Sequence, residues 1–300
     1  MNVKIANAPC SWGALEFDLG ESAAGYQQVL REMSQAGYVG TELGDWGFMP
    51  TDPAELQAAL NLEALDLLGA FVPVAFVDPT KHQAGVEAAL RVAGLMHAAG
   101  YAHAFLVLAD ENGSIPDRTS QAGRITPDMA LSPAQWDTFA AGVSKVAQAV
   151  KDQYNMRCVF HHHCGGYVET PDELAELMKR TDPSLLGLCF DTGHYAFGGG
   201  DPLAGYMQWK ERIWHVHFKD FDHKIGQQAT ENQWDYFTSV QNGVFCELGK
   251  GSVNFAEVKN ALTTSGYAGW IVVEQDVLPG MGSPLTCAIN NRNYLKTLHL

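Results

Sequence analysis

Residues that bind metals and move protons gather at the ends of four apolar segments in the second half of the chain. One segment ends in His161, His162 and His163, and the next ends at Asp191, with His194 three residues later. Alternate residues of an extended segment share a face, so we expect His161 and His163 to point one way and His162 the other. An aspartate that closes a run as apolar as LGLCF is a buried charge, which needs a partner or a metal.

The remaining two segment ends carry the same kinds of side chain. WHVHFKD places His215, His217 and Lys219 on one face, and IVVEQD puts Glu274 directly after an apolar run. Each signal alone also fits a packed histidine, a helix cap or a carboxylate beside a basic residue. Together they bring imidazoles and carboxylates to one point, which suits Mn²⁺, Co²⁺, Fe²⁺ or Zn²⁺ better than Mg²⁺ or Ca²⁺. We therefore expect one bound divalent ion, with Mn²⁺ or Co²⁺ preferred.

Aromatic and acidic residues in the first fifth of the chain form a second group. Trp12, Glu42 and Trp46 follow the first two apolar segments. A tryptophan face can stack on a sugar-like ring, although packing in the core is as common a fate for this residue. We expect these three residues to contact a small-molecule substrate.

Eight short β-rich segments must position all of these side chains, and helical patterns lie between most of them. Several segments are continuous apolar runs, which are typical of strands buried on both faces. Ser132 with Gln135, and Thr170 with Glu173, have the spacing of helix capping boxes. The eight predicted strands are residues 3–8, 38–43, 67–74, 103–108, 157–162, 186–191, 213–218 and 270–275.

Eight strands alternating with helices in 300 residues predict an α/β fold, a (β/α)8 TIM barrel, as a single domain over residues 1–300. An open sheet that binds a dinucleotide is disfavoured, because no G-x-G-x-x-G follows the first strand. Barrel enzymes place catalysis at the carboxyl ends of their strands, where the ligand-type residues lie. Residues 109–131 and 219–262 would then be long loops over the mouth of the barrel, and the second a lid.

The charge balance excludes several classes of partner. The chain has 19 Lys and Arg against 34 Asp and Glu, a formal net charge of −15, so we expect neither nucleic acid nor an anionic membrane as a partner. The longest apolar stretch is too short to span a bilayer. The first residues lack the charged and then apolar segments of a secretion signal peptide. The six cysteines include no C-x-x-C pair and indicate reduced thiols. We expect a cytoplasmic protein.

Several motifs resemble the xylose isomerase-like TIM barrels, a superfamily of sugar isomerases, epimerases and inosose dehydratase. The resemblance covers nearly the whole chain, and the run HHHCGGYVET over 161–170 is most similar to the inosose dehydratases. The other motifs that carry it are APCSWG (8–13), GYVGTELG (37–44), LCFDTGHYAFGGGDP (188–202), HVHFKD (215–220), GVFCELGKGSVNF (243–255) and GYAGWIVVEQD (266–276).

The resemblance implies a role for each residue of the strand-end group. The family's metal ligands fall on Asp191, His217 and Glu274, with His161 at the fourth place, where sugar epimerases usually have a glutamate. His194 and Lys219 match positions that contact substrate. By analogy with such barrels a homodimer is also expected.

The histidine in place of a glutamate favours one reaction over another. A dehydratase and an epimerase both take a proton beside a metal-polarised carbonyl, but a dehydratase then expels hydroxide, which needs an acid. We hypothesise a metal-dependent dehydratase of a cyclic keto-polyol such as 2-keto-myo-inositol. The alternatives are a sugar or ketose isomerase or epimerase with the same metal site, and a non-catalytic sugar-binding barrel. The candidate catalytic residues, without an assignment of acid and base, are His161, His163, His194, Lys219 and Glu274.

Overall fold

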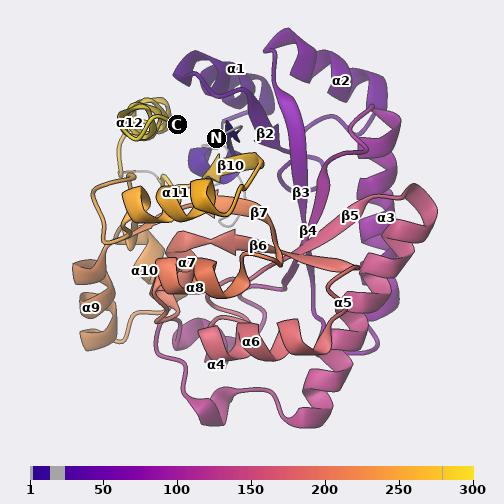
Figure 1. The fold of residues 1–300 in the computed structure, drawn as a ribbon, viewed down its shortest axis with the longest axis vertical. Coiled ribbons are helices and arrows are strands. Elements are labelled where there is room, and N and C mark those ends of the chain that lie inside the picture. Colours follow the sequence, from indigo (N-terminus) through magenta and orange to yellow (C-terminus); the bar gives the residue numbers. More distant parts are fainter. Residues whose placement is uncertain (1–2, 14–23, 279) are drawn as a thin grey trace.

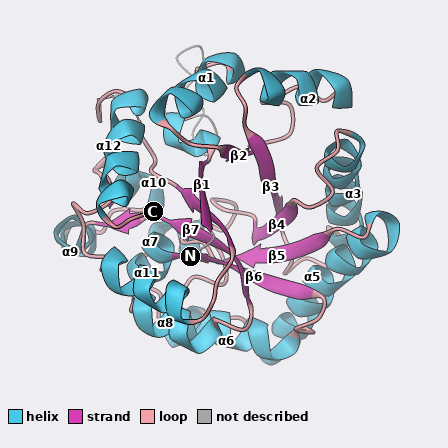
Figure 2. Cartoon of the chain, turned by 45° about the horizontal axis from the view of Figure 1, so that its top comes forward, coloured by secondary structure: helices cyan, strands magenta, loops and turns pink. Residues whose placement is uncertain are grey.

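The described residues, 3–13, 24–278 and 280–300 of a computed structural model, form a closed barrel of eight parallel strands surrounded by helices (Figures 1 and 2). The strand order is β1-β10-β7-β6-β5-β4-β3-β2, and β1 closes the ring by pairing with both β10 and β2. The predicted (β/α)8 fold is therefore confirmed. The barrel strands are β1 Val3–Asn7, β2 Gly40–Glu42, β3 Asp66–Val74, β4 Phe105–Asp110, β5 Arg157–His161, β6 Leu186–Asp191, β7 Ile213–Phe218 and β10 Gly269–Val273.

Helices cover the outside of the barrel, and several begin as the sequence predicts. The Ser132 and Thr170 side chains cap α5 and α6, each in a complete capping box. Within the described part of the chain, no helix is long and apolar enough to cross a membrane. The helices are α1 Tyr26–Ala36, α2 Pro53–Leu62, α3 His82–Ala98, α4 Pro116–Ser120, α5 Pro133–Tyr154, α6 Pro171–Arg180, α7 Thr192–Phe197, α8 Pro202–Trp209, α9 His223–Glu231, α10 Tyr236–Gln241, α11 Phe255–Thr264 and α12 Pro284–Thr297, with 3-10 turns at Pro9–Trp12 and Pro127–Met129.

Strand alternation divides the buried side chains between two environments. Along β5, Phe160 points outward and packs its ring against Phe76 and Phe139 in the layer between strands and helices. Val159 points into the barrel, where it forms a small apolar cluster with residues of β4 and β6. Because side chains alternate along a strand, the next inward residue after Val159 is His161. The same alternation that builds the core therefore directs the strand-end residues toward the barrel axis.

The two long stretches predicted as loops contain regular structure, which corrects that expectation. Residues 219–262 include β8 Asp220–Phe221, α9, α10, β9 Phe245–Cys246 and most of α11, and residues 109–131 include α4. Arg124 links the two stretches by donating to the carbonyl oxygens of Ala229 and Trp234. The polar composition and frequent glycines of these stretches gave no sequence indication of the short helices. Helices this short are stabilised mainly by tertiary contacts such as those of Arg124. The predicted lid role of 219–262 stays a prediction.

One buried carboxylate, that of Asp220, organises the turn after β9. Its two oxygens accept hydrogen bonds from four backbone amides. A buried amide left without an acceptor costs about 1 to 3 kcal/mol, so losing several acceptor contacts at once is expensive. The donors are the backbone amides of Phe221, Gly249, Gly251 and Val253.

We predict that Asp220→Ala lowers the free energy of unfolding by on the order of 3 kcal/mol, because these amides lose their acceptor. The matched control is Asp222→Ala, which removes only an N-cap at the start of α9 and should cost about 1 kcal/mol. Urea unfolding of both variants measures the difference. An Asp220 variant no less stable than the Asp222 variant would contradict this role.

Candidate metal centre and active site

Four strand ends bring four metal-ligating side chains together at the carboxyl-terminal mouth of the barrel. His161 ends β5, Asp191 ends β6, His217 lies in β7, and Glu274 follows β10. Asp191 pairs directly with His217 in the sheet register. One ligand atom from each of the four residues lies within 4.8 Å of the others. The four residues expected as ligands therefore form one cluster.

Two buried polar atoms of this cluster lie close to other ligand-type atoms but make no hydrogen bond with any described residue. His217 Nδ1 lies 3.1 Å from Glu274 Oε1 and 3.8 Å from Asp191 Oδ2, and His161 Nε2 lies 3.8 Å from the same Asp191 oxygen. His217 Nδ1 and Asp191 Oδ2 are buried and make no hydrogen bond within the described residues. Buried polar atoms of this kind need a partner, and a divalent cation among them would supply one. The donor set therefore fits a metal ion.

The excess of buried negative charge around the cluster also favours a bound cation. The carboxylates of Glu42, Asp191, Glu274 and Asp276 are all buried, as is Lys219. Lys219 Nζ lies 3.3 Å from Glu274 Oε2 and 3.1 Å from Asp276 Oδ2. One lysine does not balance four carboxylates, and buried charge is costly unless it is compensated. A divalent cation would offset most of the excess.

Glu42 fixes the orientation of His217 from the opposite side of the barrel. Its Oε1 lies 3.0 Å from His217 Nε2 and 2.7 Å from His215 Nε2. Although burial favours the neutral acid, these imidazoles hold the pKa of Glu42 down to about 2. An Nε2–H donated to Glu42 leaves Nδ1 of His217 as the nitrogen that faces Asp191 and Glu274. Gly69 leaves room for this contact, since a Cβ there would lie 3.1 Å from Glu42 Oε1.

The cluster forms part of the lining of a cavity. His161, His217 and Glu274 line it together with His163, Lys219 and Asp276. The lining also includes Phe71 and Pro73 of β3, and Phe237 of α10. Sequence reasoning missed these three residues. An apolar run such as β3 does not show which of its residues reach a cavity, and Phe237 lies in a stretch expected to be a loop.

Two of the predicted substrate contacts, Trp12 and Trp46, lie outside the lining of this cavity. Trp12 is only 3% exposed and packs in the core, where its Nε1 donates to Glu32 Oε2. Trp46 is on the surface, and the guanidinium of Arg91 lies 4.3 Å from its ring centre. Neither indole lines the cavity. Glu42, the third predicted contact, does line the cavity. Its Oε1 already makes hydrogen bonds with His215 and His217.

The histidines after β5 separate as strand alternation predicts. His161 and His163 line the cavity, whereas His162 lies on the other side of the strand, where its Nε2 accepts from the Asp191 backbone amide. Burial lowers the pKa of His162 to about 3, so this ring is neutral. His194, predicted as a substrate contact, is fully buried one layer behind the cavity, with its Nε2 3.4 Å from Lys219 Nζ. It lies in α7, directly after β6, and contacts the cavity-lining residues His163 and Lys219.

A separate buried carboxylate lies behind the cavity at the end of β4. Asp110 Oδ2 accepts from the Tyr167 backbone amide, and its Oδ1 has no hydrogen-bond partner among the described residues. Burial raises the pKa of Asp110 to about 7, against the lowering effect of backbone hydrogen bonds. Asp110 therefore takes up a proton in the native protein near neutral pH.

Comparison with known proteins places this geometry in a family. A family model for the xylose isomerase-like TIM barrel matches residues 18–291. The inosose dehydratase of Geobacillus kaustophilus is 31% identical over 297 residues, 98% of this chain and 94% of that protein, and that of Lacticaseibacillus casei is 30% identical over 98% and 97%. Among solved structures, D-allulose 3-epimerase from Methylomonas sp. aligns with a TM-score of 0.72, covering 99% and 98% of the two chains, at 17% identity. That last likeness concerns the fold alone.

We predict that Asp110→Asn flattens part of the dependence of stability on pH. The pKa of Asp110 is near 4 in the unfolded chain and near 7 in the native protein. Between these two values the native state keeps a proton that the unfolded chain has lost. The free energy of unfolding therefore falls as pH rises, by on the order of 4 kcal/mol. The asparagine variant lacks this titration. Urea unfolding between about pH 5 and pH 8 should therefore show the variant gaining stability relative to the wild type as pH rises. Parallel curves for the two proteins would contradict the assignment.

Proposed function

The chain belongs to the xylose isomerase-like TIM barrel family, and from this premise we propose that it is a metal-dependent dehydratase of a cyclic keto-polyol such as 2-keto-myo-inositol. The observation that carries the proposal is the cluster of His161, Asp191, His217 and Glu274 beside a cavity, in a chain similar over its whole length to inosose dehydratases. The comparisons support a dehydratase, and the exact substrate is part of the proposal.

The four clustered residues would hold the ion. A divalent metal bound there would polarise a substrate carbonyl and would stabilise the negative charge that develops beside it. Glu274 directs Oε1 at His217 and Oε2 at Lys219, so its two oxygens have different neighbours. We assign Glu274 Oε2 to take the proton from the carbon beside the carbonyl, with the Lys219 ammonium next to the developing negative charge.

His163 is the group that we assign to protonate the departing hydroxyl. It lines the cavity from the same strand end as His161. Its Nδ1 lies 2.7 Å from both the carbonyl oxygen of Cys164 and the side-chain amide nitrogen of Asn112, and its Nε2 lies 3.4 Å from the Tyr236 hydroxyl. We assign Nε2 to give a proton to the leaving group and to take one back later. Loss of hydroxide from the β-carbon needs such an acid, whereas epimerisation does not.

The reaction itself is tested by the mass of the product. The purified protein, loaded with Mn²⁺ or Co²⁺, should convert 2-keto-myo-inositol to a compound lighter by one water, and protein treated with a chelator should not. A product of unchanged mass would establish an epimerase or isomerase in place of a dehydratase. A metal-loaded protein that binds the compound without changing it would contradict both reactions and favour a sugar-binding barrel.

Two neighbouring histidines provide a matched pair of variants. We predict that His163→Gln lowers kcat by about 10²- to 10⁴-fold and keeps the metal, because only proton transfer is lost. His161→Gln should instead lose much of the bound metal, because it removes one of the four ligands. Metal analysis and steady-state kinetics of both variants measure this split. If His163→Gln lost metal, or if it kept full kcat, its role as the acid would be wrong.

A further inference from the structure

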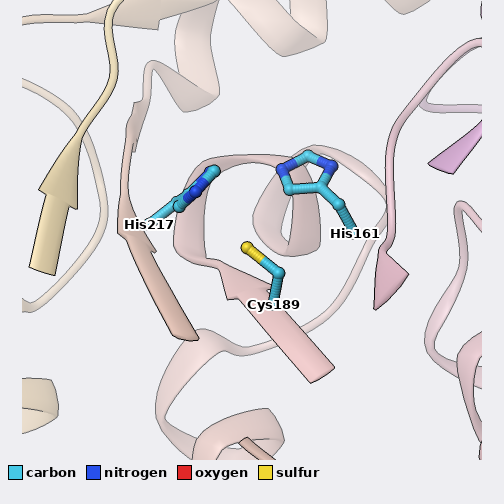
Figure 3. Close-up of side chains that lie close together, drawn as sticks. All are labelled: His161, Cys189 and His217. Atoms are coloured by element: carbon cyan, nitrogen blue, oxygen red, sulfur yellow. The ribbon is translucent and has the colours of Figure 1, made fainter. Parts of the chain in front are cut away.

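A cysteine lies directly beneath the metal ligands inside the barrel. Cys189 and Asp191 are alternate residues of β6, so both point inward, with Cys189 one layer deeper. Its sulfur and one ring nitrogen from each of His161 and His217 all lie within 4.8 Å of one another. Figure 3 shows the three side chains converging from their strands, with the sulfur close to both rings.

Ordinary packing explains only part of this arrangement. Cys189 is fully buried and contacts an apolar cluster that includes Phe105 and Val107, which suits a small apolar side chain. Its sulfur also lies within 4.8 Å of a ring nitrogen of His217. An apolar residue beneath the two rings would provide the packing but no ligand for a cation.

We propose that His161, Cys189 and His217 form a second, deeper metal position that takes a thiophilic ion such as Zn²⁺, Co²⁺ or Cd²⁺. Two imidazoles and a thiolate are a donor set that such ions prefer, whereas Asp191 and Glu274 in the upper position suit a harder ion such as Mn²⁺. Both positions use His161 and His217, so one ion excludes the other. This inference rests on the metal-binding part of the proposed function and does not depend on the reaction.

Binding at the deeper position changes the protonation of the sulfur. The S–H bond of Cys189 breaks, a sulfur–metal bond forms, and the proton passes to solvent. In the absence of an ion the thiol is neutral and packs as a small apolar side chain.

The test is the absorption spectrum of the whole protein with Co²⁺ or Cd²⁺ after removal of other metals. The wild type should show a sulfur-to-metal charge-transfer band that reaches its full intensity at one ion per chain. Cys189→Ala should lose the band, and Cys189→Ser, which keeps more of the side-chain volume, should lose it as well. The matched control is Cys158→Ala, since Cys158 is an equally buried thiol on β5 that points to the outer core, and this variant should keep the band.

The outcomes separate this inference from the proposed function. Absence of the band in the wild type, with Mn²⁺ still bound, would overturn the deeper position and leave the upper one intact. A band that persists in both Cys189 variants would also overturn it, because the sulfur would then belong to another cysteine, such as Cys10 at the cavity wall. Failure to bind Mn²⁺, Co²⁺ and Cd²⁺ alike would overturn both metal positions.

Discussion

The constraint on which the rest of the site depends is an excess of buried negative charge at the mouth of the barrel. Asp191, Glu274, Asp276 and Glu42 are removed from water together, and the buried lysine among them is Lys219. Electrostatic repulsion among carboxylates is strong where the dielectric is low. The arrangement is favourable only if imidazoles, the lysine and a bound cation share the charge. A divalent ion bound at this site would meet residues that are already in place.

Neighbouring residues hold the carboxylates and imidazoles of the cluster in position. Glu42 contacts both His215 and His217 through one oxygen, and Gly69 supplies the space that this oxygen needs. His162, on the outer side of β5, accepts from the Asp191 backbone amide and so links the ends of β5 and β6. Such contacts around metal ligands fix their orientation and tautomer. Each of them follows from the inward and outward alternation of side chains along a strand.

The same alternation explains how much could be predicted from the sequence. Eight apolar segments alternating with helical patterns predicted the barrel, and the carboxylates and histidines that end four of them predicted one cluster, because the carboxyl ends of parallel strands meet at one face. The family resemblance then indicated which four residues form it. The direction of Trp12 and Trp46 could not be predicted, because both lie outside strands and have no period that orients them. Phe237 was missed because α10 is too short to show a helical pattern. Cys189 looked like one more apolar strand residue, since only the folded barrel brings its sulfur to the histidines.

Thermal unfolding of metal-free protein with and without added Mn²⁺ tests whether the buried carboxylates and imidazoles bind a cation. A ligand that binds only the native state at 100 times its Kd stabilises the protein by about 2.7 kcal/mol. We expect a rise in Tm that grows with Mn²⁺ concentration and that is much smaller in Glu274→Gln, which lacks one buried carboxylate. The same Tm with and without Mn²⁺, in protein that otherwise unfolds cooperatively, would contradict it.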